Sequence, residues 1–152
     1  KKVLRDVDED EFMNNISLVR EKVNDRAVLR AMHFFAENKR AEAEVRALEN
    51  GDFEAFKELV TESGRSSYMY NQNVFTSKDV EHQNVSVALA MCEYILKGKG
   101  AWRVHGGGFA GTIQAFVPVD MLGEFCEKME AVFSKGSCYV LSVRPFGGIK
   151  LF

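Results

Sequence analysis

Apolar residues in the first third of the sequence recur at intervals of three and four, the spacing that places them on one face of a helix. Asp8 and Glu11 have the spacing of a capping box and predict the start of a short helix. We expect a long second helix that is capped by Asp25 and ends at Gly51, a residue that tolerates the left-handed conformation of a helix terminus. Its small and apolar positions are Ala27, Ala31, Phe34, Phe35, Val45 and Leu48.

A third helix is predicted directly after Gly51. Asp52 is its expected cap, and its apolar face consists of Phe53, Phe56, Leu59 and Val60. The pair Ser63–Gly64 is expected to end this helix. Because the connection between the second and third helices is short, the two should form an antiparallel pair.

Helical spacing is lost over residues 65–78. This segment predicts a short strand within a loop, because it contains three aromatic residues that favour strands, Tyr68, Tyr70 and Phe75. A helix is expected next, over residues 79–97, with Thr76 and Asp79 in a second capping-box pattern.

The rest of the chain reads as strands and one more helix. Ile113, Ala115 and Val117 alternate and fall on one face of a strand. The expected elements are strands at 101–105 and 112–117, a helix at 121–134, and strands at 138–143 and 148–152. The order from residue 68 onward predicts a ferredoxin-like α+β layer, an antiparallel sheet with helices on one face.

Length and composition fit one domain over residues 1–152, with leading helices at 1–64 and the ferredoxin-like layer at 65–152. Hydrophobic residues make up 46% and charged residues 28%, with a net charge of −2. The sequence lacks the basic stripe that is typical of nucleic-acid-binding proteins. None of its apolar runs approaches the ~20 residues that a helix needs to span a bilayer. No signal peptide is recognised, so a cytoplasmic location is expected.

The cysteines Cys92, Cys126 and Cys138 are odd in number and far apart, and no two form a CxxC pair. Neither structural zinc nor a disulfide framework is therefore expected, and reduced thiols are the simplest interpretation. The three histidines also lack the spacing of metal ligands. No metal site is predicted in this chain.

Four glycines crowd the stretch "RVHGGGFAGTIQAFVP", which begins at Arg103. Gly106, Gly108 and Gly111 have the GxGxxG spacing of a dinucleotide-binding turn. That turn must be followed by a helix, whereas the residues here alternate like a strand, and the expected acidic residue about 20 positions later is missing. A dinucleotide site is therefore disfavoured, and a Walker phosphate loop is absent.

Two interpretations of the glycines stay open. They could form a plain hairpin turn without a function. A hairpin needs only one or two glycines, however, and each further glycine costs about 0.5–1 kcal/mol relative to alanine. Four together favour a backbone that approaches something closely, such as an anion held by consecutive amides.

The glycine stretch resembles the third signature of the GHMP small-molecule kinases, most closely that of galactokinases, which typically reads Thr-Gly-Gly-Gly-Phe-Gly-Gly. Other segments resemble galactokinases in the same order along the chain. They are "VLRDV", "LRAMHFFAENKR", "ALENGDFEAFKELVTESGRSS" and the closing "YVLSVRPFGGIKLF". The resemblance is collinear over nearly the whole sequence, which makes it far more specific than the glycine loop alone.

The resemblance implies the C-terminal domain of an enzyme that transfers the γ-phosphoryl group of ATP, with Mg²⁺, to the anomeric hydroxyl of galactose. The family's phosphate loop and its catalytic Asp and Arg belong to an N-terminal domain, and those motifs do not occur in these 152 residues. No catalytic residue is therefore expected here, and the chain alone should be inactive. Its implied partners are the sugar, ATP and its own N-terminal domain.

The residues implied to approach the phosphate loop and the sugar are Gly106, Gly107, Gly108, Phe109, Ala110 and Gly111. The sequence departs from the family at several points and so indicates a divergent branch. Ala110 stands where glycine is usual, Thr112 where Cys is common, His105 where Thr is common, and Gly64 in place of a His.

Further polar residues have weaker claims to a site. His105, His82 and the pair His33 and Glu37 are expected to have structural roles. The residues Ser63, Ser66 and Ser67 are expected to cap turns, while Tyr68, Tyr70 and Asn73 are candidates to line the cleft. Two alternative functions remain: a non-catalytic relative that senses sugar and ATP, and a free-standing nucleotide-binding module.

Overall fold

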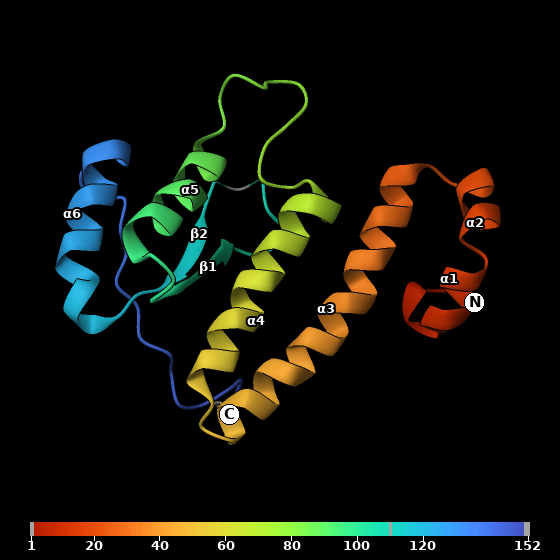
Figure 1. Cartoon of the computed structure of the whole chain (residues 1–152), viewed down its shortest axis with the longest axis horizontal. Coiled ribbons are helices and arrows are strands. Elements are labelled where there is room, and N and C mark those ends of the chain that lie inside the picture. Colours follow the sequence, from red (N-terminus) through yellow and green to blue (C-terminus); the bar gives the residue numbers. More distant parts are fainter. Residues whose placement is uncertain (1, 110, 151–152) are drawn as a thin grey trace.

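The computed structural model describes residues 2–109 and 111–150, which contain six α-helices and two strands (Figure 1). The helices are α1 (Glu9–Asn14), α2 (Ile16–Lys22), α3 (Asp25–Glu49), α4 (Phe53–Ser66), α5 (Asn84–Leu96) and α6 (Leu122–Phe133). The strands are β1 (Ala101–Val104) and β2 (Ile113–Phe116). Short helical turns are η1 (Leu4–Asp6), the π-helical η2 (Ser67–Asn71) and η3 (Val119–Met121).

Helices α3 and α4 form the predicted antiparallel pair in the middle of the molecule (Figure 1). Gly51, in the turn between them, has the left-handed φ of +70° expected of it. The Asp52 side chain accepts a hydrogen bond from the amide of Ala55 and caps α4, as predicted. The domain boundary expected at residue 64 falls inside α4, which continues to Ser66.

The N-terminal helices pack against the first half of α3. Asp8 caps α1 by accepting a hydrogen bond from the amide of Glu11, which confirms the predicted helix start. The cap of α3 is Asn24 rather than Asp25, because the Asn24 side chain accepts the bond from the Ala27 amide while Asp25 lies in the first turn. The apolar centre of this region consists of Phe12, Val28, Ala31 and Phe35.

Strands β1 and β2 form an antiparallel hairpin in which Val104 pairs with Ile113. The predicted face of Ile113, Ala115 and Val117 is confirmed, because these side chains pack on the apolar cluster of α5 and α6. The opposite face presents Ala101 and Phe116 to α3 and α4. The small sheet therefore has a pair of helices on each face.

Helix α4 does not end at Ser63–Gly64 as predicted. Gly64 is buried against β1, where an added Cβ would lie 2.9 Å from the carbonyl oxygen of Trp102 and 3.0 Å from Cβ of Arg103. The stabilisation from this close packing outweighs the cost of a glycine inside a helix, which is about 1 kcal/mol relative to alanine.

The predicted strand within residues 65–78 is wrong, because the helical chain continues from α4 into η2. Tertiary packing on α3 outweighs the strand preference of the aromatic residues there. The following helix begins at Asn84, not at Asp79. Thr76 and Asp79 form a turn instead, with the Asp79 carboxylate bound to His82.

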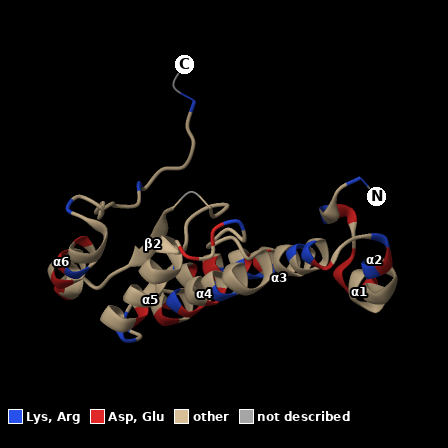
Figure 2. Ribbon diagram, turned by 90° about the horizontal axis from the view of Figure 1, so that it is seen from above, with Lys and Arg blue, Asp and Glu red and all other residues tan. Residues whose placement is uncertain are grey.

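The strands predicted at 138–143 and 148–152 are not formed in the described residues, and residues 151 and 152 lie outside them. After α6 the chain turns back so that Cys138 packs on the apolar cluster of α5 and α6, and from there an exposed segment runs away from the helices toward the C-terminus (Figure 2). Its apolar side chains Leu141 and Val143 are 87% and 90% exposed. A strand needs a hydrogen-bonded neighbouring strand, and in the described part of the chain β1 and β2 pair only with each other.

The architecture is thus α+β with a two-stranded antiparallel sheet. The finer ferredoxin-like topology stays a prediction. Among the described residues, no helix is both long and apolar enough to cross a bilayer.

The contact of Gly64 with β1 gives a test of this packing. Gly64→Ala should lower the free energy of unfolding by about 1–3 kcal/mol, because the new methyl group has no space. Gly123→Ala, in α6, should leave it unchanged or raise it by up to about 1 kcal/mol, because an added Cβ there would meet nothing within 4 Å. Urea unfolding of both variants measures the difference, and equal effects would contradict the packing.

Candidate functional site: the glycine hairpin

Residues 105–112 join β1 to β2 and contain the glycine stretch. The amide of His105 donates a hydrogen bond to the carbonyl of Thr112, 3.1 Å away, which extends the ladder beyond the strands. Among the described residues of the loop, four have left-handed backbones, Gly106 (φ +61°), Gly108 (+76°), Phe109 (+57°) and Gly111 (+82°). Ala110 lies outside the described residues.

Asn73 anchors the hairpin to the rest of the protein. It is 2% exposed, and its Nδ2 donates to the carbonyl of Gly107 at 3.1 Å. Its backbone carbonyl accepts the amide of Phe109 at 2.9 Å, and its Oδ1 accepts the hydroxyl of Ser67 at 3.1 Å. A buried amide with its hydrogen bonds made in this way restrains the loop that it binds.

The glycines of the loop are required for different reasons. A Cβ on Gly108 would lie 2.3 Å from the carbonyl oxygen of Asn73, so the fold itself excludes a side chain there. Gly106 and Gly111 have open space around them but need a positive φ. Gly107 has neither a positive φ nor any described atom within 4 Å of where a Cβ would lie. Nothing within the described chain therefore requires glycine at position 107.

A hollow of about 640 Å³ adjoins the hairpin at Phe109. Two cations and three aromatic residues contribute to its wall, Arg26, Lys78, Tyr68, Phe75 and Phe109, with Met69, Gln72, Thr76 and Ser77 completing it. No carboxylate lines it among the described residues. Its charge and ring faces suit an anionic ligand that also carries a flat or apolar group.

The structure places the sequence-predicted residues as follows. Gly106 to Phe109 lie together at the hairpin, and Tyr68 shares the adjoining hollow with Phe109. Tyr70 does not line this hollow, and Asn73 is buried beneath the loop instead of facing a cleft. Arg26 and Lys78 were not found by sequence reasoning, because they come from distant segments and belong to no local motif.

A network of polar side chains, which we call the polar seam, lies between α3, α4 and β1. Its members are His33, Glu37, Arg40, Glu44, Ser63, Ser66 and Arg103. Ser63 donates to Glu37 at 2.5 Å, and Glu37 also pairs with Arg40. His33 does not bond to Glu37 as a helix pair; its Nδ1 hydrogen-bonds Ser66 at 2.9 Å. Ser63 and Ser66, which were expected to cap turns, instead join helices across this interface.

The seam continues to the sheet through Arg103. This residue of β1 donates to Gln114 of β2 at 3.0 Å and to Glu44 of α3 at 3.3 Å. Burial raises the pKa of Glu44, while the neighbouring Arg103 opposes that shift. The seam thus orients the hairpin strands on the helical pair and leaves no buried side-chain polar atom without a partner among the described residues.

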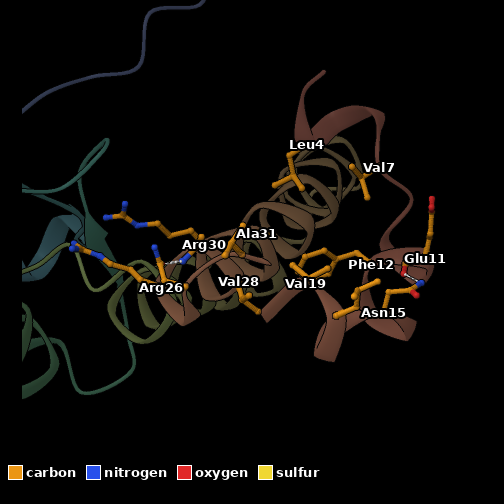
Figure 3. A pocket seen from close by; sticks show the side chains of 14 residues that line it. Leu4, Val7, Glu11, Phe12, Asn15, Val19, Arg26, Val28, Arg30 and Ala31 are labelled. Carbon is orange, nitrogen blue, oxygen red and sulfur yellow. Dashed lines mark hydrogen bonds between the residues drawn. The ribbon is translucent and has the colours of Figure 1, made fainter. Parts of the chain in front are cut away.

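A larger hollow of about 910 Å³ lies between η1, α1, α2 and α3 (Figure 3). Its walls are mainly apolar and include Leu4, Val7, Val19 and Val28. Arg26 also lines the hollow beside the hairpin. The larger hollow contains no cluster of reactive groups among the described residues, so the hairpin is the stronger candidate site.

Within the described residues, no group of three or more histidine, cysteine or acidic side chains is placed to hold a metal ion. A comparison with models of known protein families finds none that matches this sequence. The candidate site therefore rests on the geometry of the hairpin and of the hollow beside it.

The anchor formed by Asn73 can be tested directly. Asn73→Ala should lower the free energy of unfolding by about 1–3 kcal/mol, because the Gly107 carbonyl and the Ser67 hydroxyl lose their partner. Amide exchange at Phe109 should also accelerate. Asn71→Ala, in the same segment, should change the free energy of unfolding by less than about 0.5 kcal/mol. Unchanged exchange in the Asn73 variant would show that the loop is held in another way.

The seam predicts a pH dependence of stability. Burial lowers the pKa of His33 below its usual 6.5, with Glu37 opposing the shift and Arg40 adding to it. Because the unfolded chain binds the proton more readily, the stability present above about pH 6.5 should be lost as the pH falls through the lower, folded-state pKa. Unfolding measured from pH 7.5 to 5 should show a smaller decline for His33→Gln. His82→Gln, at the surface, should behave like the wild type.

Proposed function

We propose that this chain is the C-terminal part of an ATP-dependent sugar kinase of the galactokinase type. In this proposal the hairpin Gly106–Gly111 closes the phosphate and sugar end of a cleft whose other wall is an N-terminal domain. The collinear resemblance to galactokinases motivates the proposal, and one structural observation supports it. Gly107 has no positive φ and no described atom within 4 Å of where a Cβ would be; Gly123 shares these properties, but only Gly107 lies in the glycine hairpin, where its bare backbone leaves room for an external group.

The chemistry of the hairpin region fits a phosphate-bearing ligand. Backbone without side chains at Gly106 and Gly107 leaves room for phosphate oxygens or for the loop that holds them. Arg26 and Lys78 supply positive charge beside the hairpin, and the ring of Phe109, 52% exposed, covers the same hollow. ATP with Mg²⁺ would supply the transferable γ-phosphoryl group when bound, and the resemblance implies that most of its contacts come from the N-terminal domain.

The contribution of this chain to such a reaction is positioning. Phosphoryl transfer depends mainly on aligning donor and acceptor and on stabilising phosphate charge. A rigid hairpin, fixed by Asn73 below and by the Arg103 seam at its base, would hold one wall of the cleft and exclude water from it. The catalytic base is assigned to the N-terminal domain, so the isolated chain is expected to be inactive.

The decisive experiment uses the whole protein encoded by the gene. It should phosphorylate galactose with ATP, and Gly107→Val should reduce that activity by roughly a hundredfold, because it displaces the aligned groups. Its unfolding midpoint should change little, since an added Cβ at this position has no described atom within 4 Å. Gly123→Val is the matched control and should keep full activity, because an added Cβ at this position of α6 also has no described atom within 4 Å.

Other outcomes distinguish the alternatives. A whole protein that binds ATP and galactose without turnover would support a non-catalytic sensor and overturn the enzyme proposal. Tight ATP binding by the 152-residue chain alone, measured by calorimetry, would instead favour a free-standing nucleotide-binding module.

A further inference from the structure

The fold gathers all three cysteines of the chain at one place. Cys92 of α5 is a member of the apolar cluster between α5 and α6, and Cys126 of α6 and Cys138 of the following segment both pack on that cluster. Cys126 and Cys138 therefore lie near one another on the same apolar cluster, close enough for each thiol to affect the other. The first and last cysteines are far apart in the sequence, and only the tertiary structure joins them.

A reversal of the chain after α6 brings Cys138 back to Cys126. Ser134 and Gly136 have left-handed backbones, with φ of +82° and +84°, and the Gly136 amide donates to the Glu130 carboxylate at 3.0 Å. From Cys126 the helix advances about 10 Å to its end, at roughly 1.5 Å per residue. A turn closed by a hydrogen bond from the Ser137 amide to the Ser134 carbonyl, at 3.3 Å, then reverses the chain, and Cys138 packs on the same apolar cluster as Cys126.

The three thiols differ in their access to solvent. Cys92 is fully buried, and burial raises the pKa of its thiol to about 12, so it is inert at neutral pH. Cys126 and Cys138 are both partly exposed. A small oxidant in solution therefore reaches Cys126 and Cys138 and not Cys92.

We propose that Cys126 and Cys138 are a reversible oxidation site, at which a small disulfide such as oxidised glutathione produces an intramolecular disulfide. The tether would fix the start of the C-terminal segment on α6. That segment carries the exposed apolar side chains Tyr139, Val140, Leu141, Val143, Phe146 and Ile149.

The chemistry consists of two thiol–disulfide exchanges. Burial raises the pKa of the Cys138 thiol and so lowers its share of the nucleophilic thiolate, which makes Cys126 the candidate for the first attack. It forms a mixed disulfide with one glutathione and releases the other as thiolate. The Cys138 thiol then loses its proton and attacks Sγ of Cys126, which releases the second glutathione. Two protein thiols are oxidised and one oxidised glutathione becomes two reduced molecules, so the reverse reaction needs only reduced glutathione.

The test uses the folded chain incubated with oxidised glutathione, alkylated, unfolded and digested with trypsin without reduction. Lys128 and Lys135 lie between the two cysteines, so cleavage there separates the Cys126 and Cys138 peptides unless a disulfide joins them. Mass spectrometry should find the two peptides joined and Cys92 as a free thiol. Added dithiothreitol should release them.

Single variants provide the controls. Cys126→Ser and Cys138→Ser should each stop at a glutathione adduct on the remaining partner, whereas Cys92→Ala should still form the joined peptides. Stable glutathione adducts on both cysteines of the wild type, a disulfide that involves Cys92, or disulfides only between chains would each overturn the proposal. A wild type that stays fully reduced under these conditions would do so as well.

Discussion

The close approach of α4 to β1 is the contact on which the rest of this structure depends. A hairpin with four residues in each strand is at best marginally stable in water, and it persists here because helices cover both of its faces. Gly64 permits that approach, since its missing side chain lets the helix rest on the backbone of Trp102. Ala101 and Phe116 then complete an apolar centre with Phe56 and Val60.

The geometry of the candidate site depends on the contact between α4 and β1. Once β1 lies on α4, Arg103 reaches the polar seam, and the loop after β1 projects over the segment that follows η2. Asn73 in that segment binds the loop from beneath with both its side chain and its backbone. The hairpin is therefore held at its base and at its tip by polar groups that are satisfied within the protein. At Gly106, Gly107 and Gly111, by contrast, no described atom lies within 4 Å of where a Cβ would be, so these loop positions are open to solvent.

Local signals were reliable where local physics decides the structure. The caps at Asp8 and Asp52, the left-handed Gly51 and the alternating face of β2 depend on a few neighbouring residues, and all were predicted correctly. The main errors of prediction concern segments whose secondary structure is set by contacts with residues far away in the sequence. Helix α4 passes through Gly64 because β1 packs there, and η2 replaces a predicted strand because it packs on α3. Residues 138–143 have a strand-like sequence, but in the described part of the chain β1 and β2 pair only with each other and this segment joins no sheet.

The sequence by itself determined the helices of the first half, the hairpin that bears the glycines and the α+β class, because propensity, capping and periodicity act over short distances. It also marked the glycine stretch as unusual. Only the tertiary structure decided that Gly108 is packed against Asn73 while Gly107 is open, that Arg26 and Lys78 share a hollow with Phe109, and that three scattered cysteines meet. These facts depend on which distant segments pack together, and packing is settled by the burial and hydrogen bonding of the whole chain rather than by any single stretch of it.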